Sequence, residues 1–196
     1  MPRILAFAGS TRTGSLNQKL LRVAAARARA QGGEIDEVDL RDYPMPLYNG
    51  DLEAAEGLPD VVLRWKELLL SHGALLLACP EYNSSITPLL KNAIDWASRA
   101  APGEGPLAAF RGKVAGLVSA SPGVLGGLRG LITVRSILGN IGVHVIPSQL
   151  ALPKANEAFT PQGELVDPGT AKRLDLVMLE LLTTAQRLAG EAPAAR

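Results

Sequence analysis

Residues 74 to 96 read ALLLACPEYNSSITPLLKNAIDW, and this stretch decides the fold class. It begins with an uninterrupted apolar run, Ala74 to Cys79, which is typical of a strand that is buried on both faces of a sheet. It ends with apolar residues at helical spacing, before which Thr87 and Pro88 supply an N-cap and a first helical residue. A buried strand that leads through a short polar connection into an amphipathic helix is the repeating unit of a parallel α/β sheet.

The same alternation of strand and helix extends to both sides of this stretch. Two more apolar runs, Ile4 to Ala8 and Val114 to Ala120, predict central strands. Weaker candidates at Glu34 to Leu40 and His144 to Gln149 are more polar, and the second contains a proline, which suits edge positions. The sequence therefore predicts an α/β fold with a doubly wound, five-stranded parallel sheet of strand order 2-1-3-4-5 and helices on both faces.

The chain length favours one domain. We place this domain at residues 1–190 of the 196 and expect a disordered tail at residues 191–196. Two connections, residues 41–58 and 151–168, are longer than usual, which makes them candidates for a lid, a ligand contact or a subunit contact. The first of them contains too many apolar side chains for a solvated loop, so we expect it to be buried against another subunit.

Composition excludes several classes of function. Twenty basic and nineteen acidic residues give a net charge of +1, and because the basic residues are scattered, nucleic acid is not an expected partner. We see no signal peptide and no membrane span, so we expect a cytoplasmic protein without membrane contact. The single cysteine, Cys79, and the two histidines, His72 and His144, lack the spacing of metal ligands, so we expect no metal and interpret all three as structural.

The segment GSTRTGSLN, residues 9 to 17, predicts an anion site. It follows the first strand and leads into a helix that begins with a capping box of Ser15 and Gln18. Free N–H groups and the helix dipole favour an anion there. Its glycines have P-loop spacing, but Ser15 and Leu16 stand where that motif needs Lys and Ser or Thr, and G-x-G-x-x-G is absent. We expect this site to bind a terminal monophosphate. The residues expected to hold it are Ser10, Thr11, Arg12, Ser15 and Asn17. The alternative is a hydroxyl-rich turn that only caps the helix.

Two other loops are expected at the same edge of the sheet. Pro80 to Asn83 follows the third strand, and SASPGVLGG, residues 119 to 127, leads out of the fourth into a glycine-rich turn where backbone can approach a ligand. With strand order 2-1-3-4-5, these two loops and the first one face a single crevice.

Together, GSTRTGSLN, the ungapped PEYNSSITPLLKNAIDW and SASPGVLGG resemble the NADPH-dependent FMN reductase family of the flavodoxin-like fold, which also includes chromate, quinone and azo-dye reductases. The resemblance covers almost the whole chain. It implies FMN as cofactor, NADPH or NADH as co-substrate and a small-molecule electron acceptor. It also implies a homodimer or homotetramer, because MPLYNGDLE, residues 45 to 53, is similar to the family's loop that reaches a neighbouring subunit.

The resemblance also implies which residues touch the flavin. Those that would hold the FMN phosphate are Ser10, Arg12, Ser15, Leu16 and Asn17. Those that would line the isoalloxazine ring are Pro80, Glu81, Tyr82 and Asn83, with Ser121 and Gly123 on its far side. We interpret Glu81 and Tyr82 as positioning residues, because hydride transfer between nicotinamide and flavin needs no side-chain proton shuttle; FMN itself carries the chemistry.

We therefore expect an oxidoreductase that takes a hydride from NADPH or NADH at flavin N5. It would then pass two electrons to a quinone, an azo compound, a flavin or a metal oxyanion in a ping-pong sequence. One alternative is a flavodoxin-type electron carrier without its own NAD(P)H turnover. The near-neutral net charge and Arg12 in the phosphate loop argue against this alternative. Another is an FMN-binding regulator without catalysis, which only an assay of NADPH oxidation excludes.

Overall fold

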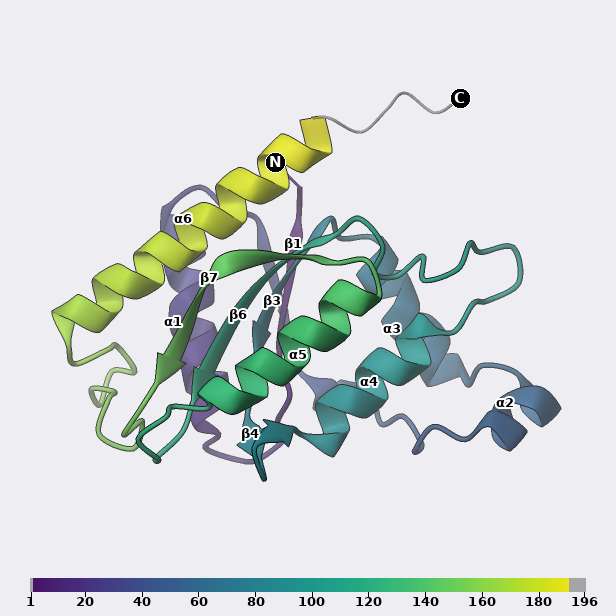
Figure 1. Ribbon diagram of the computed structural model, residues 1–196, viewed down its shortest axis with the longest axis horizontal. Coiled ribbons are helices and arrows are strands. Elements are labelled where there is room, and N and C mark those ends of the chain that lie inside the picture. The colour runs from purple at the N-terminus through teal and green to yellow at the C-terminus, as the bar shows by residue number, and fades with distance from the viewer. Residues whose placement is uncertain (1, 191–196) are drawn as a thin grey trace.

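A computed structural model describes residues 2–190 of the chain, so the tail expected at residues 191–196 lies outside the described part. Five parallel strands form the central sheet in the order β2-β1-β3-β6-β7. The strands are β1 (Ile4–Ala8), β2 (Ile35–Val38), β3 (Ala74–Ala78), β6 (Val114–Ala120) and β7 (His144–Leu152). Counted along the chain this order is 2-1-3-4-5, which confirms the predicted topology. The carboxyl ends of the strands lie along the lower edge of the sheet in Figure 1.

Helices cover both faces of the sheet, as predicted (Figure 1). On one face are α1 (Leu16–Ala30) and α6 (Pro168–Gly190); on the other are α3 (Asp60–Leu70), α4 (Pro88–Ser98) and α5 (Leu128–Asn140). Within β1, Ile4 and Ala6 contact the first group and Leu5 and Phe7 the second. Because both faces of β1, β3 and β6 are covered, every residue of these strands is buried, which explains their uninterrupted apolar runs.

The edge strands differ from the predicted ranges. β2 is shorter than predicted, whereas β7 continues to Leu152. The register of β7 against β6 shifts between Ala115 and Leu117, which pair with Val145 and Gln149, and Pro147 lies in the unmatched part. A proline has no N–H to donate to the ladder, so it is accommodated at this irregularity.

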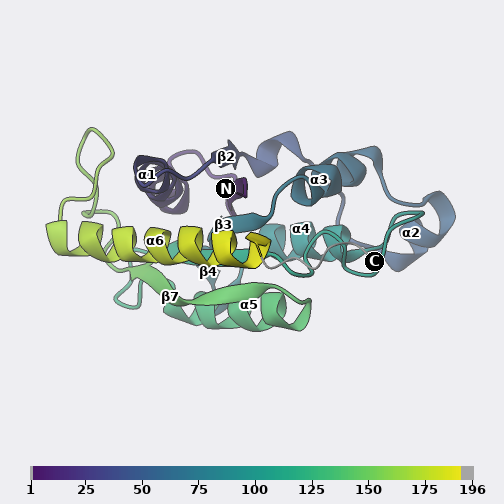
Figure 2. The same cartoon turned by 90° about the horizontal axis from the view of Figure 1, so that it is seen from above.

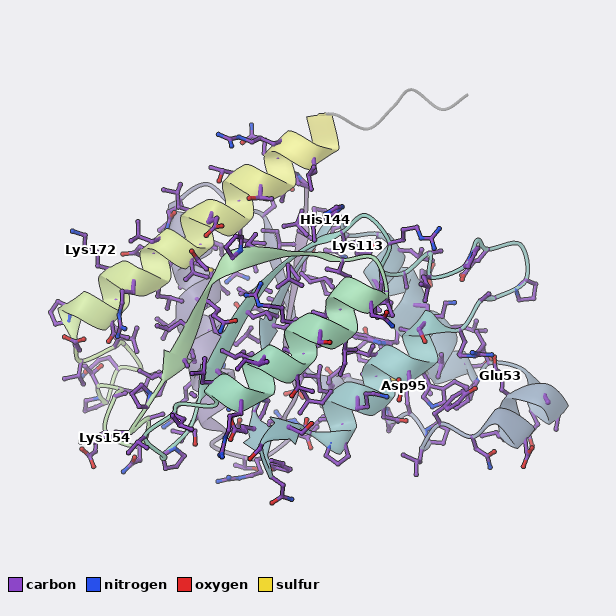
Figure 3. All side chains as sticks on the ribbon, viewed as in Figure 1. Glu53, Asp95, Lys113, His144, Lys154 and Lys172 are labelled. Carbon is purple, nitrogen blue, oxygen red and sulfur yellow. The ribbon has the colours of Figure 1, made fainter. Side chains whose placement is uncertain are left out.

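The long segment at residues 41–58 is partly helical. It begins within a short 3₁₀ turn, η1 (Leu40–Asp42), and contains α2 (Gly50–Glu56), none of whose residues is buried. The Asn92 amide and the Trp96 indole both donate to the Pro46 carbonyl oxygen, at 2.9 and 2.7 Å, so the segment is fixed against α4. α2 projects at one end of the molecule in Figure 2, and Figure 3 shows Glu53 there.

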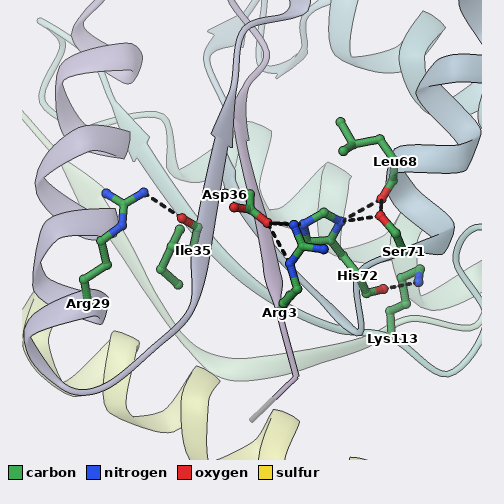
Figure 4. Close-up of polar contacts among 8 residues, drawn as sticks. All are labelled: Arg3, Arg29, Ile35, Asp36, Leu68, Ser71, His72 and Lys113. Atoms are coloured by element: carbon green, nitrogen blue, oxygen red, sulfur yellow. Dashed lines mark hydrogen bonds and ion pairs between the residues drawn. The ribbon is translucent and has the colours of Figure 1, made fainter.

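A polar network joins the amino ends of the strands, at the edge opposite the loops (Figure 4). His72 follows α3 with a buried ring, whose Nδ1 lies 2.7 Å from the Leu68 carbonyl oxygen and whose Nε2 lies 2.7 Å from the Asp36 carboxylate. Arg3 also donates to Asp36, and the buried Lys113 ammonium donates to the His72 carbonyl oxygen. These contacts indicate that His72 has a structural role at this edge of the sheet.

None of the described helices is both long enough and apolar enough to cross a membrane.

Candidate functional site

Three loops meet at the carboxyl edge of the sheet. They follow β1, β3 and β6, which are neighbours in the sheet, and they comprise residues 9–15, 79–86 and 121–127. The second loop is a small hairpin of two antiparallel strands, β4 (Glu81–Tyr82) and β5 (Ser85–Ile86), which lies at the lower edge of the molecule in Figure 1. In parallel α/β sheets this edge is where ligands bind.

Three side chains connect the starts of these loops. The Thr87 hydroxyl donates to the Gly9 carbonyl oxygen at 2.7 Å, and the Ser119 hydroxyl donates to the Cys79 carbonyl oxygen at 2.6 Å. The Asn17 amide donates to the Ala120 carbonyl oxygen at 2.8 Å and accepts from the Ala120 N–H at 3.0 Å. Thr87, Ser119 and Asn17 are all buried, so their hydrogen bonds are protected from water. The loops are therefore fixed relative to one another before any ligand binds.

The loop after β6 comes so close to its neighbours that only glycine fits. A Cβ added to Gly127, which has φ +91°, would lie 1.9 Å from the Ser119 hydroxyl oxygen. A Cβ on Gly126, with φ +61°, would lie 2.6 Å from the Leu152 backbone. The paired glycines therefore let the chain turn from β6 into α5 without moving away from the crevice.

The β1–α1 loop offers an array of backbone donors. Ser15 is the N-cap of α1, and its hydroxyl oxygen accepts from the Gln18 N–H at 3.4 Å. Among residues 2–190, six N–H groups of this loop and the first helical turn make no hydrogen bond: those of Ser10, Thr11, Thr13, Gly14, Leu16 and Asn17. Gly14, with φ +71°, supplies the left-handed turn, and the exposed Arg12 adds a positive charge. Capping by Ser15 leaves these donors unused, so the loop can bind an anion in addition to starting the helix.

The predicted phosphate residues lie in this loop and in the first turn of α1, where Leu16 and Asn17 begin the helix, but their side chains differ in setting. Ser10 and Ser15 are buried, and each hydroxyl oxygen already accepts one backbone N–H within the loop. Both hydroxyls can still donate a hydrogen bond outward. The Asn17 side chain binds Ala120, so its share in an anion site is its backbone N–H. Thr11 and Arg12 are exposed.

The hairpin explains the unusual sequence after β3. Asn83 and Ser84, with φ of 49° and 66°, form its two-residue turn, and positive φ at both positions is the signature of a type I′ turn. Pro80 is buried, whereas the Tyr82 side chain is 48% exposed, so the hairpin presents an aromatic ring and a polar turn at the crevice. Sequence analysis placed these residues in the site but did not predict the hairpin.

The Glu81 side chain is engaged within the protein. Its carboxylate accepts from Arg129 Nε at 2.9 Å, from Arg129 Nη2 at 2.6 Å and from the Gly130 N–H at 3.1 Å. Burial by itself raises the pKa of Glu81, but the hydrogen bonds from Gly130 and Arg129 outweigh it and hold the pKa below its usual value. Glu81 thus joins the hairpin to the first turn of α5. Arg129, its partner, is a positioning residue that sequence analysis missed.

The loop after β6 combines polar backbone with apolar side chains. The Ser121 hydroxyl oxygen accepts from the Gly123 N–H at 3.2 Å. The next residues, Val124 and Leu125, have exposed side chains, at 80% and 44%. The predicted pair of Ser121 and Gly123 therefore lies in the loop that follows β6, next in the chain to two exposed apolar side chains.

These donor groups suit a phosphorylated, planar ligand better than a metal ion. Residues 2–190 contain no group of three or more His, Cys, Asp or Glu side chains that could hold a metal. Cys79 is fully buried, and burial raises the pKa of its thiol, which favours the protonated core residue that the sequence predicted. The β1–α1 loop has N–H donors and the Arg12 guanidinium, which can bind a phosphate. The hairpin with Tyr82 and the glycine turn after β6 can contact a planar ring. This donor set fits FMN.

Comparisons with known proteins show the family of the chain. The family model described as NADPH-dependent FMN reductase matches residues 2–157. The chain is 36% identical over 189 residues to an NAD(P)H-dependent FMN reductase of Pseudomonas aeruginosa, covering 96% of this chain and 97% of that protein. It is 35% identical over 194 residues to a probable NADPH:quinone oxidoreductase of Oryza sativa, covering 96% and 91% of the two chains.

Among solved structures, the NAD(P)H:(acceptor) oxidoreductase FerB from Paracoccus denitrificans superposes with a TM-score of 0.82 at 30% identity, covering 95% of this chain and 98% of its own. The matched residues of the family model include all three loops of the crevice. The chain belongs to the NADPH-dependent FMN reductase family.

Proposed function

We propose that the crevice between the three loops holds FMN, with its phosphate at residues 10–17 and its ring between Pro80–Asn83 and Ser121–Gly123. The observation that supports this proposal is the set of unpartnered N–H groups at the start of α1, in a segment that hydrogen bonds from Thr87 and Asn17 join to the residues flanking the hairpin and the glycine turn. A phosphate binds well at a helix N-terminus, and the adjoining strand ends supply the surface for the ring.

When bound, FMN would supply the redox chemistry, which is the uptake of a hydride from NADPH or NADH and the passage of two electrons to an acceptor. The protein supplies binding, orientation and electrostatics. Arg12 balances the phosphate charge, and Tyr82 and Asn83 position the ring from the hairpin. Val124 and Leu125, whose apolar side chains are exposed in the loop after β6, would limit water beside the bound ring.

The exposed rim favours a planar acceptor such as a quinone. Three exposed apolar or aromatic side chains, Tyr82, Val124 and Leu125, belong to the hairpin and the loop after β6 that would flank the ring, and burial against a flat acceptor would remove their surface from water. A metal oxyanion would gain nothing from these contacts. Azo compounds and free flavins share the planar shape and belong to the same proposal. Because the nicotinamide and the acceptor would use the same open crevice, they would react in turn, in a ping-pong sequence.

We also propose that the protein acts in the cytoplasm as a homodimer or homotetramer. Reduced nicotinamides are intracellular, and a lone buried thiol suits a reducing compartment. Leu47, in the segment 41–58, is 79% exposed, and the adjoining α2 buries none of its own residues. Such a projecting, partly apolar arm is suited to contact a second copy of the chain.

The test is steady-state kinetics of the FMN-loaded protein, with NADPH and NADH each paired with a quinone, an azo dye, free FMN, ferric iron and chromate. We expect fast oxidation of a nicotinamide with the quinone and parallel double-reciprocal lines when both substrates are varied. Intersecting lines would contradict the ping-pong order. Absence of nicotinamide oxidation with every acceptor would favour the electron carrier, and flavin-free protein serves as the control.

A further inference from the structure

We infer that Gln18 is a positioning residue for the FMN phosphate: it holds the Ser10 carbonyl oxygen and thereby turns the Thr11 N–H outward, as a donor to the phosphate. This inference rests on the proposed function, because it concerns the same phosphate site. FMN is the cofactor of the family, so the ligand does not have to be deduced from the loop alone. A free N–H group binds an anion only when it points toward it, and the structure shows what sets that direction.

The direction of each N–H group follows from the carbonyl group before it. Residues 2–190 contain no cis peptide bond. In a planar trans peptide the C=O and the following N–H point in opposite directions. A carbonyl oxygen that is held toward the protein therefore turns the N–H of the next residue away from it. Three carbonyl oxygens of the β1–α1 loop are held in this way, those of Gly9, Ser10 and Arg12.

Two of these carbonyl oxygens are held by the N-caps of helices. The hydroxyl of Thr87, the buried N-cap of α4, donates to the Gly9 carbonyl oxygen at 2.7 Å. The N–H of Ser15, the N-cap of α1, donates to the Arg12 carbonyl oxygen at 3.2 Å. The N–H of the residue after each of these two carbonyls makes no hydrogen bond. Both donors therefore remain for a ligand, and both have a fixed direction.

Gln18 holds the third carbonyl oxygen, that of Ser10. Its amide nitrogen Nε2 donates to this oxygen at 3.0 Å, and no other group among residues 2–190 does so. In the capping box expected from the sequence, the Gln18 side chain would instead accept from the Ser15 N–H. Only half of that box forms, because the Ser15 hydroxyl oxygen accepts from the Gln18 N–H while the Gln18 amide reaches the loop. Thr11 is exposed and its N–H is free, so the direction of this donor depends on one side chain.

Asp39, which follows β2, fixes the orientation of the Gln18 amide. Its carboxylate lies 3.5 Å from the same Nε2 atom. The carboxylate is itself held by Arg41, whose N–H, Nε and Nη2 donate to it at 2.9, 3.0 and 2.6 Å. Hydrogen bonds from the Arg41 side chain are the main reason why the pKa of Asp39 lies below its usual value, which keeps it ionised. A carboxylate and a carbonyl oxygen both accept, so the nitrogen of the amide, not its oxygen, must face them.

A second glutamine of α1 shows what a purely structural role looks like. The amide of Gln31, at the other end of the helix, donates to the Asp175 carbonyl oxygen at 3.2 Å. It makes the same kind of hydrogen bond as Gln18, from a side-chain amide to a backbone carbonyl, but far from the phosphate loop. Gln31→Met is therefore the matched control for Gln18→Met. Methionine keeps the unbranched shape and the helix propensity of glutamine and removes its N–H donors.

The inference is tested by titrating flavin-free protein with FMN and with riboflavin, which differ only in the phosphate, while flavin fluorescence is followed. We expect Gln18→Met to weaken FMN binding about three- to tenfold and to leave riboflavin binding unchanged, because one hydrogen bond to the phosphate loses its direction. Gln18→Asn, whose shorter amide should not reach the Ser10 carbonyl oxygen, should act in the same way, and Gln31→Met should alter neither affinity. In amide NMR spectra of the wild type, FMN but not riboflavin should move the Thr11 N–H resonance downfield, and Gln18→Met should reduce that shift.

An equal loss for FMN and riboflavin in Gln18→Met would overturn the inference, because Gln18 would then only support the fold. Unchanged FMN binding in both Gln18 variants would overturn it as well. The proposed function fails differently. A wild type that binds FMN and riboflavin equally well would overturn the proposed phosphate site and this inference with it. A wild type that prefers FMN, with Gln18 variants that keep the full preference, would overturn this inference alone.

Discussion

Asn17 shows how one side chain serves the site without being free to touch the ligand. Sequence analysis selected it as a phosphate ligand because an amide near a helix N-terminus is a natural donor. In the structure its amide fills both hydrogen-bonding positions of the Ala120 backbone, and so ties α1 to the end of β6. The Glu81 carboxylate is likewise engaged within the protein, because it accepts two hydrogen bonds from Arg129. A sequence can predict that such residues belong to the site, but their partners lie up to 103 positions away along the chain and become visible only in the fold.

At the residue scale, Arg12 is predicted to select FMN through its phosphate. A hydrogen bond to a charged group contributes about 1.5–3 kcal/mol, so Arg12→Ala should weaken FMN binding by about ten- to a hundredfold. Riboflavin, which lacks the phosphate, should bind the variant as it binds the wild type, and FAD should bind the wild type less tightly than FMN does. Quenching of flavin fluorescence measures all three affinities, with Arg64→Ala as control. An equal loss for riboflavin and FMN would show that Arg12 supports the fold instead.

Glu81 is predicted to stabilise the hairpin in a pH-dependent way. Glu81→Gln removes the pair with the half-exposed Arg129 and should lower the free energy of unfolding by about 1–2 kcal/mol at neutral pH. Because the folded pKa of Glu81 lies below its ordinary value of 4.5, the stabilisation is present above that value and is lost as the pH falls through the folded pKa. Urea unfolding of the wild type and the variant should therefore converge in acid. Glu67→Gln, an exposed carboxylate of α3, is the control; a difference that persists unchanged in acid would contradict the ionic origin.

Among the helices and strands, those with a buried face were the ones that the sequence could predict. The three central strands and the helices α1, α4 and α6 could be predicted from apolar spacing, because elements covered on one or both sides must be apolar there. The hairpin could not, since each of its strands has two residues and its turn contains Asn83 and Ser84 with no glycine. α2 was missed because it buries no residue and so leaves no apolar stripe in the sequence.

The turn from β6 into α5 is predicted to tolerate no side chain at Gly127. Gly127→Ala places a Cβ against Ser119 and adds left-handed backbone strain, so it should destabilise the protein by about 2–4 kcal/mol. It should also weaken FMN, because the loop would move away from the crevice. Gly139→Ala is the matched control: its Cβ would meet open space on α5, and it should stabilise by up to about 1 kcal/mol. Equal free energies of unfolding for the two variants, measured in urea, would refute the close approach.

At the scale of the whole molecule, family membership makes the chain an FMN- and NADPH-dependent oxidoreductase. The resemblance carried by three short motifs implied the cofactor, and the strand order brings these motifs to one edge of the sheet. The mouth of the crevice was harder to anticipate. A cavity of about 180 Å³ at the phosphate loop is lined by residues of α1 and by Arg41, which follows β2, and no local motif marks that combination.

The projecting arm is predicted to hold a dimer together. Leu47→Glu puts a charge on its most exposed apolar side chain and should raise the dimer dissociation constant at least about tenfold, because an unpaired charge would be buried in the contact. Leu176→Glu, at an exposed leucine on α6, is the matched control and should leave the assembly intact. Sedimentation velocity at micromolar concentration distinguishes the outcomes. A wild-type protein that is already monomeric at this concentration would contradict the proposed contact between subunits.

A crystal structure of the protein with FMN would show whether the three loops form the flavin site. We predict the phosphate within hydrogen-bonding distance of the free N–H groups at residues 10–17, and the ring between the hairpin at residues 81–86 and the turn at residues 121–127. We also predict that these loops keep their present positions, because Thr87, Ser119 and Asn17 already fix them. Density for FMN elsewhere, such as in the groove of about 520 Å³ between α1 and residues 162–164, would contradict this placement.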